Sequence, residues 1–165
     1  MKAKHDQRGF TLLELLVVIT IIGMLAAIVF ASLTTSRNKG ADANIKSDLK
    51  NAMAQAQLFY DLGGSSYSGV CALSGTYNVG SMVNAAEKTY NQGTPTVYGN
   101  GTASTWNTAQ CHDSQGAWAA VVPLRSSVNG ATVAWCVDHT GVSKQISTTS
   151  VSILTTSGVN QYQCP

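Results

Sequence analysis

Residues 10–30 read FTLLELLVVITIIGMLAAIVF, and only Thr11, Glu14, Thr20 and Gly23 interrupt their apolar side chains. An α-helix of this length extends about 31 Å, which is close to the hydrocarbon thickness of a bilayer. The alternative is a helix buried in the core of a soluble domain. The length of the stretch and its single charge favour the membrane, so we expect a membrane-spanning helix near the N-terminus.

The charges of the chain are unevenly distributed around this stretch. Lys2, Lys4, Asp6 and Arg8 precede it and together account for the formal net charge of +2. The remaining residues are therefore nearly neutral, which gives no sign of nucleic-acid binding. A short basic tail normally stays in the cytoplasm, so the part after the helix is expected outside.

We expect four parts along the 165 residues, enough for one domain with an appendage. They are a polar leader at 1–9, the apolar helix at 10–35, a second helical half at 36–62 and a β-rich head at 63–165. The second half carries an amphipathic stripe with helical spacing, which predicts one buried face. The stripe consists of Ile45, Leu49, Ala52, Ala56 and Phe59.

The head reads as strands separated by turns. Two apolar runs at 118–124 and 131–137 flank Asn129-Gly130, a strong signal for a β-hairpin. Further strands are expected at 142–146, after a turn at 138–141, and at 151–154. The glycine-rich region 63–116 predicts loops with short helical or strand pieces, among them a helix at 82–90.

The junction between leader and helix, residues 8–14, reads RGFTLLE. A secretory signal would be cut after its apolar core, where only Val29-Phe30-Ala31 offers a weak site. The junction resembles the processing site of bacterial type IV prepilins, which include pilins and the pseudopilins of secretion and DNA-uptake machines. The resemblance implies cleavage between Gly9 and Phe10 by prepilin peptidase and methylation of the new Phe10 amine.

Glu14 is the only charged residue of the apolar stretch, and in the family the matching glutamate acts in assembly. A carboxylate near the bilayer centre costs about 2.5–3.5 kcal/mol on insertion scales. In a filament, Glu14 of one subunit can pair with the Phe10 amine of a neighbour and neutralise both charges. Thr11 is expected to help bind the amine. The alternative is that Glu14 lies at the membrane interface.

The resemblance implies an α+β pilin fold, in which the long N-terminal helix packs through its amphipathic half on a small antiparallel β-sheet head. Four cysteines in an exported part indicate disulfides. Pilin heads often have a disulfide near the C-terminus, which favours Cys136 with Cys164 and leaves Cys71 with Cys111. Four cysteines allow three pairings, so the connectivity stays open.

A metal site or an active site finds less support in the sequence. Cys111, His112, Cys136 and His139 offer zinc ligands, but the adjacency of the first two hinders joint coordination. No nucleophile elbow, HExxH or phosphate-loop pattern is present. We expect no cofactor, no metal and no enzymatic activity, and we interpret His112-Asp113 and Asp138-His139 as turn residues.

The sequence therefore predicts a structural subunit of a type IV pilus-like filament, with roles such as cell adhesion or motility. Expected partners are other copies, related pilins, prepilin peptidase, an inner-membrane assembly platform and, before assembly, membrane lipid. The precursor is expected in the cytoplasmic membrane and the assembled subunit at the cell surface.

Two alternatives remain. A pseudopilin of a type II secretion or competence apparatus would use the same helix, but such proteins often bind calcium through acidic loops. After Gly63 only Glu87, Asp113 and Asp138 are acidic, which is poor for calcium. A single-pass anchored binding domain would need neither Gly9 nor Glu14.

Overall fold

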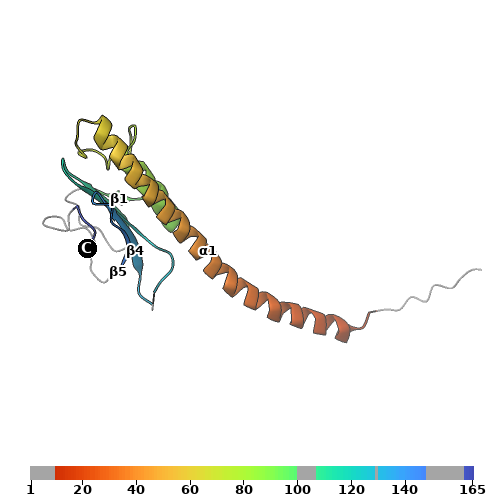
Figure 1. Ribbon diagram of the computed structural model, residues 1–165. Helices are drawn as coiled ribbons and strands as arrows, with labels where there is room; N and C mark the ends of the chain where they lie inside the picture. Colours follow the sequence, from red (N-terminus) through yellow and green to blue (C-terminus); the bar gives the residue numbers. More distant parts are fainter. Residues whose placement is uncertain (1–9, 100–106, 129, 148–161) are drawn as a thin grey trace, which may run out of the picture. The chain divides into compact units, whose positions relative to one another are not determined.

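The structure is a computed structural model that describes residues 10–99, 107–128, 130–147 and 162–165 (Figure 1). The chain divides into two compact units, Met1–Arg37 and Asn38–Pro165. The elements are α1 (Leu12–Leu62), α2 (Val79–Asn91), β1 (Val97–Tyr98), β2 (Ala109–Asp113), β3 (Trp118–Pro123), β4 (Val133–Asp138) and β5 (Ser143–Ser147).

In the first unit, α1 is a strongly apolar helix. An 18-residue window within it has a mean hydropathy of 2.8, and none of that window is buried. By length and composition alone, the helix is able to cross a membrane. Gly23 and Gly40 do not interrupt it, because a single glycine costs only about 1 kcal/mol relative to alanine.

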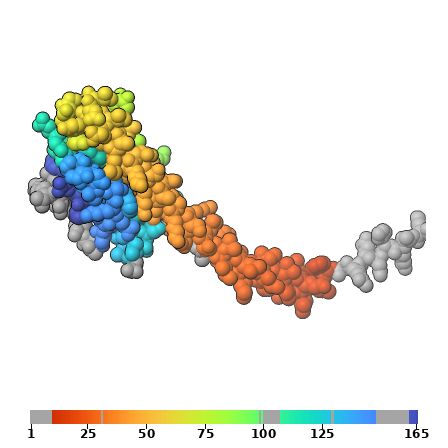
Figure 2. Space-filling model, viewed as in Figure 1, coloured from red at the N-terminus to blue at the C-terminus, as the bar shows by residue number. Residues whose placement is uncertain are grey.

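In the second unit, α1 buries four residues of the predicted stripe, whereas Phe59 is only partly buried. Ile45, Leu49, Ala52 and Ala56 are each at most 1 % exposed. They form one core with residues of α2 and of the inner face of the sheet, including Val79, Val83, Trp118, Ala120 and Val122. Figure 2 shows the yellow part of α1 against the strands of this unit. The expected α+β architecture is therefore confirmed.

The helix ends at Leu62, at the boundary expected from the sequence, and two glycines follow it. Gly63 donates its backbone N–H to the Phe59 carbonyl at 2.8 Å, which closes the last turn. Gly64 then adopts a φ of +82°, in the left-handed region that glycine enters without steric cost. The chain thereby leaves the helix axis and starts the loops of the head.

The five strands form one sheet in the order β1-β2-β3-β4-β5. The pairs from β2 to β5 are antiparallel, as predicted, whereas the two-residue β1 pairs with β2 in parallel. All six residues of β3 are buried because β3 is the central strand and both its faces are covered. Its alternate residues Ala119 and Val121 join a second cluster on the face opposite α1, with Ala134, Cys136 and Ile146.

The predicted turns are confirmed where the structure describes them. Val128 and Ala131 exchange two backbone hydrogen bonds of 2.9 Å around Gly130, whose φ is +78°. Asn129 of this hairpin lies outside the described residues, as does the strand expected at 151–154. The helix expected at 82–90 is α2, which is slightly longer than predicted.

The interpretation of His112-Asp113 as turn residues is wrong. Both lie in β2, and the His112 side chain is fully buried. Asp113 accepts a hydrogen bond of 2.8 Å from the backbone N–H of Cys71, which joins the glycine-rich loop to the sheet. The apolar residues of this strand, Ala109 and Cys111, alternate with Gln110 and His112, but the run is short and follows a glycine-rich region, and the burial of its polar face has no local signal.

Candidate functional site at the start of α1

Thr11 and Glu14 form a closed hydrogen-bonded pair at the start of α1. The Glu14 backbone N–H donates to Thr11 Oγ1 at 3.2 Å. In return, Glu14 Oε2 accepts from the Thr11 backbone N–H at 3.0 Å and from the Thr11 hydroxyl at 2.9 Å. This is a capping box, in which the two side chains satisfy backbone donors that the first helical turn leaves unpaired.

Sequence reasoning missed the capping box, although its signature of threonine followed three residues later by glutamate is readable at residues 11–14. Thr11 was expected to bind the Phe10 amine, and the structure instead brings it to Glu14. The box holds the carboxylate within the first turn. Within the described residues, Glu14 has no cationic partner, so its charge is balanced only by hydrogen bonds and the positive end of the helix.

Phe10 is 78 % exposed and lies directly before the box. Gly9 and the rest of the leader, residues 1–9, lie outside the described residues. The structure therefore describes only Phe10 of the predicted cleavage junction.

Apolar side chains are exposed along the whole first unit of α1. Leu12, Leu13, Met24 and Phe30 are between 69 % and 87 % exposed, and no large apolar residue of 12–30 is buried. An apolar surface of this extent needs lipid or protein around it. The capped carboxylate sits at one end of this surface.

The head contains two disulfides, Cys71–Cys111 and Cys136–Cys164, with Cα–Cα distances of 5.5 and 5.8 Å. This is the pairing that the resemblance favoured. Cys111 and Cys136 are therefore engaged in disulfides and supply no thiolates to the alternative zinc site. Among the described residues, no three metal-ligating side chains lie together.

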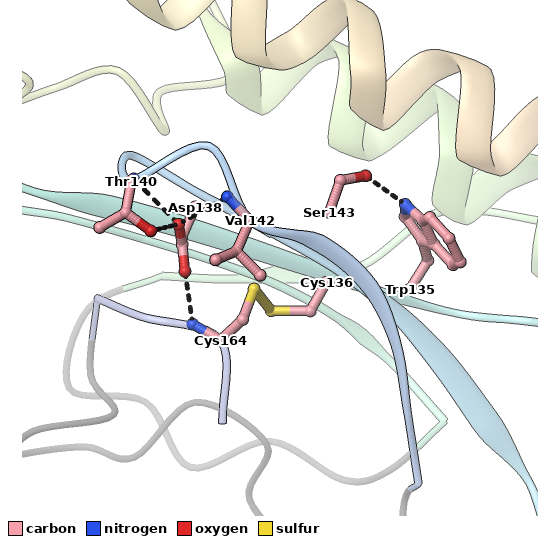
Figure 3. The surroundings of a disulfide bond; sticks show 7 residues. All are labelled: Trp135, Cys136, Asp138, Thr140, Val142, Ser143 and Cys164. Carbon is pink, nitrogen blue, oxygen red and sulfur yellow. Dashed lines mark hydrogen bonds between the residues drawn. A yellow bond between two sulfur atoms is a disulfide. The ribbon is translucent and has the colours of Figure 1, made fainter.

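Asp138 reinforces the second disulfide (Figure 3). Its Oδ2 accepts from the Cys164 backbone N–H at 2.9 Å. Its Oδ1 accepts from the Thr140 N–H at 2.9 Å, the Thr140 hydroxyl at 2.6 Å and the Val142 N–H at 3.3 Å. One buried carboxylate thus holds both the turn after β4 and the C-terminal tail.

Two other buried carboxylates were not singled out from the sequence. Asp42 of α1 accepts the backbone N–H groups of Arg125 at 2.6 Å and Ser126 at 3.1 Å, which joins the helix to the loop after β3. Glu87 of α2 is fully buried and accepts from Asn91 Nδ2 at 2.7 Å. Burial raises the pKa of Glu87 to about 7, although a backbone hydrogen bond from Ala109 opposes the shift.

Comparison with known proteins places the resemblance at the N-terminus. Residues 4–30 match the prokaryotic N-terminal methylation motif. The chain is 44 % identical over 61 residues to the type II secretion system core protein G of Escherichia coli K12, covering 35 % of this chain and 42 % of that protein.

Two further relatives match over a similar length. The core protein G of Klebsiella michiganensis is 41 % identical over 64 residues, which cover 39 % of this chain and 44 % of that protein. The type IV wide pilus major component PilA4 of Thermus thermophilus is 36 % identical over 64 residues, 39 % of this chain and 48 % of that protein. The chain therefore spans less than half the length of these curated relatives. No solved structure matches.

Proposed function

Because its N-terminal segment carries the methylation motif of the type IV pilin and pseudopilin family, we propose that this chain is the precursor of a filament subunit. In this proposal the precursor is cut between Gly9 and Phe10, and the new Phe10 amine is methylated. The apolar part of α1 is held in the membrane first and then forms the core of the filament.

The observation that carries the proposal is a carboxylate fixed at the end of an exposed apolar helix. In a segment that only anchors a domain, Glu14 caps the helix, but its uncompensated charge costs free energy in an apolar environment. In a filament, the same carboxylate can neutralise the Phe10 amine of a neighbouring copy. The capping box supports this role, because it holds the Glu14 carboxylate in a defined position before any partner arrives.

The proposed partners follow from this assembly route. They are prepilin peptidase, an inner-membrane assembly platform, related pilins and other copies of the chain. Before assembly, the basic tail stays inside and the head outside, in accordance with the charge rule for short loops. The assembled subunit lies at the cell surface.

A second candidate is a pseudopilin of a type II secretion system. It is favoured by the similarity to core protein G in Escherichia and Klebsiella. The two candidates differ in where the polymer forms. A pilus subunit is recovered in filaments sheared from the cell surface, whereas a pseudopilin stays in the envelope.

Substitutions at the capping box test the assembly role. Glu14→Gln keeps the box, which accepts glutamine in place of glutamate, but removes the charge. Thr11→Ala removes the hydroxyl and keeps the charge, so it is the matched control. We expect Glu14→Ala to abolish polymer, Glu14→Gln to reduce it, and Thr11→Ala to leave most of it.

The assay measures crosslinked polymer in the envelope and filament sheared from the cell surface. Each amount is expressed relative to the membrane-bound pool. The loss expected for Glu14→Ala reflects about 3–5 kcal/mol for breaking a buried charge pair, a penalty that recurs at every subunit contact. Normal polymer yield with Glu14→Ala would refute the charge pairing. A defect in Thr11→Ala as severe as in Glu14→Gln would indicate that Glu14 acts only by capping the helix.

A further inference from the structure

A polar pocket opens in the second unit between the C-terminal end of α2 and the loop that follows β3. Its volume is about 380 Å³, and it is lined by Asn38, Tyr90, Asn91, Leu124, Arg125 and Thr132. The size lies at the lower end of the range for small-molecule sites. The pocket does not involve the start of α1, so what it binds is independent of the proposed assembly role.

Both the backbone N–H and the guanidinium of Arg125 are hydrogen-bonded. Its backbone N–H donates to the buried Asp42 carboxylate at 2.6 Å, which fixes the loop. With the Gln92 amide oriented to satisfy its neighbours, its oxygen accepts from Nη1 of Arg125 at 2.7 Å and from Nη2 at 3.1 Å. A side chain that is already ordered loses little conformational entropy when it binds a ligand.

The guanidinium retains binding capacity. Two of its five N–H donors bond Gln92, and within the described ranges no hydrogen bond uses the other three. Among the residues that the structure describes, no carboxylate forms an ion pair with Arg125, and no acidic side chain lines the pocket. Arg125 is therefore the one charged side chain among the described lining residues, and it supplies a directional donor.

The other walls offer neutral hydrogen-bonding groups. Asn38 and Asn91 bring amides, Thr132 a hydroxyl and Tyr90 a phenol. Burial raises the pKa of Tyr90, Glu87 raises it further and Arg125 lowers it, so both charges act on a phenol that remains a donor at neutral pH. The Asn91 amide nitrogen already donates to Glu87 at 2.7 Å, which directs its oxygen away from that bond as an acceptor.

We propose that this pocket binds a carboxylate-bearing sugar, a uronic acid unit of an acidic polysaccharide. A guanidinium recognises a carboxylate through two parallel hydrogen bonds. The ring hydroxyls of a sugar, which both donate and accept, match the mixed amide, hydroxyl and phenol groups around Arg125. The volume accommodates one or two sugar rings.

The test uses the purified full chain in a mild detergent, titrated with galacturonic acid and followed by calorimetry or ligand-observed NMR. Galactose has the same ring without the carboxylate, and inorganic phosphate supplies a charge without the sugar. We expect saturable binding of galacturonic acid with a Kd of about 1 mM, and binding of galactose and phosphate at least tenfold weaker.

Three variants locate the site. Arg125→Gln should weaken galacturonic acid binding at least tenfold, and Asn38→Ala a few-fold. Lys88→Gln removes an exposed charge of α2 that does not line the pocket, so it should bind as the unmodified chain does. Far-UV circular dichroism and unreduced mass verify the fold and the disulfides of each variant.

The inference is overturned by three outcomes. These are no saturable binding of galacturonic acid, equal binding after Arg125→Gln in a folded chain, and phosphate binding as tight as galacturonic acid. The last would identify a general anion site. If Arg125→Gln fails to fold, an unchanged affinity in Asn38→Ala overturns the proposed location.

Discussion

Replacing Glu87 by glutamine should stabilise the head at alkaline pH and remove part of its pH dependence. Glu87 is fully buried, and its Oε2 has no hydrogen-bond partner among the described residues. Burial raises its pKa from 4.5 to about 7. Keeping this carboxylate ionised therefore costs free energy in the folded head but not in the unfolded chain.

The sign and size of the pH dependence of stability follow from the pKa values of Glu87 in the unfolded and folded states. Between pH 4.5 and 7 the folded state binds more protons than the unfolded state, so stability falls as the pH rises through this window and then levels off. A difference of about 2.5 pKa units corresponds to about 3 kcal/mol, of which about 2.5 kcal/mol is lost between pH 5 and pH 8.

Urea unfolding of an oxidised head fragment that begins at Ser36 measures this directly. Glu87→Gln should exceed the unmodified fragment by about 3 kcal/mol at pH 8 and by less than about 1 kcal/mol at pH 5. The substituted amide keeps an acceptor for Asn91. Asp61→Asn, at an exposed carboxylate, is the control and should change neither value. If Glu87→Gln shows the same pH dependence as the unmodified fragment, the buried ionised carboxylate is not its cause.

Two further substitutions probe contacts that hold the head together, and both are read by the same unfolding measurement. Asp42→Ala leaves the N–H groups of Arg125 and Ser126 without their acceptor, so it should cost about 2–4 kcal/mol, and Asp42→Asn should cost less. If Asp42→Ala lowers the free energy of unfolding by less than Asp42→Asn does, the contact contributes little to stability. Replacing Cys136 and Cys164 together by serine opens a crosslink with a sequence separation of 28, which should cost about 3.5 kcal/mol. An unchanged midpoint would mean that Asp138 alone secures the tail.

The elements that depend on local pattern were predictable from the sequence. The stripe from Ile45 to Ala56 repeats with the helix period, and its burial follows directly. The hairpin around Gly130 and the end of α1 at Gly63 depend on residues whose backbone preferences are strong. These signals act over a few residues, so one sequence suffices to read them.

The contacts that depend on distant residues were not predictable. Asp42 meets Arg125 across a sequence separation of 83, and no local feature of either residue indicates the other. Glu87 looks like a surface residue of an amphipathic helix until α2 is packed on the sheet. His112 was misread for the same reason, since its burial depends on what covers the sheet.

At the start of α1 the sequence revealed the junction but not the local geometry. Gly9, Phe10 and Glu14 were found as a motif, whereas the bonds between Thr11 and Glu14 became visible only in the structure. The difference matters for the chemistry, because a capped carboxylate stabilises its own helix in addition to any role between subunits.

Mass analysis of the intact protein and its N-terminal peptide, taken from the membranes of the native cell, tests the filament proposal most directly. A chain that begins at Phe10 with a methylated amine is the expected result, because residues 4–30 match the prokaryotic N-terminal methylation motif and include the start of the apolar helix. A chain that still begins at Met1, or one that begins at Ser32 after removal of the helix, would contradict it.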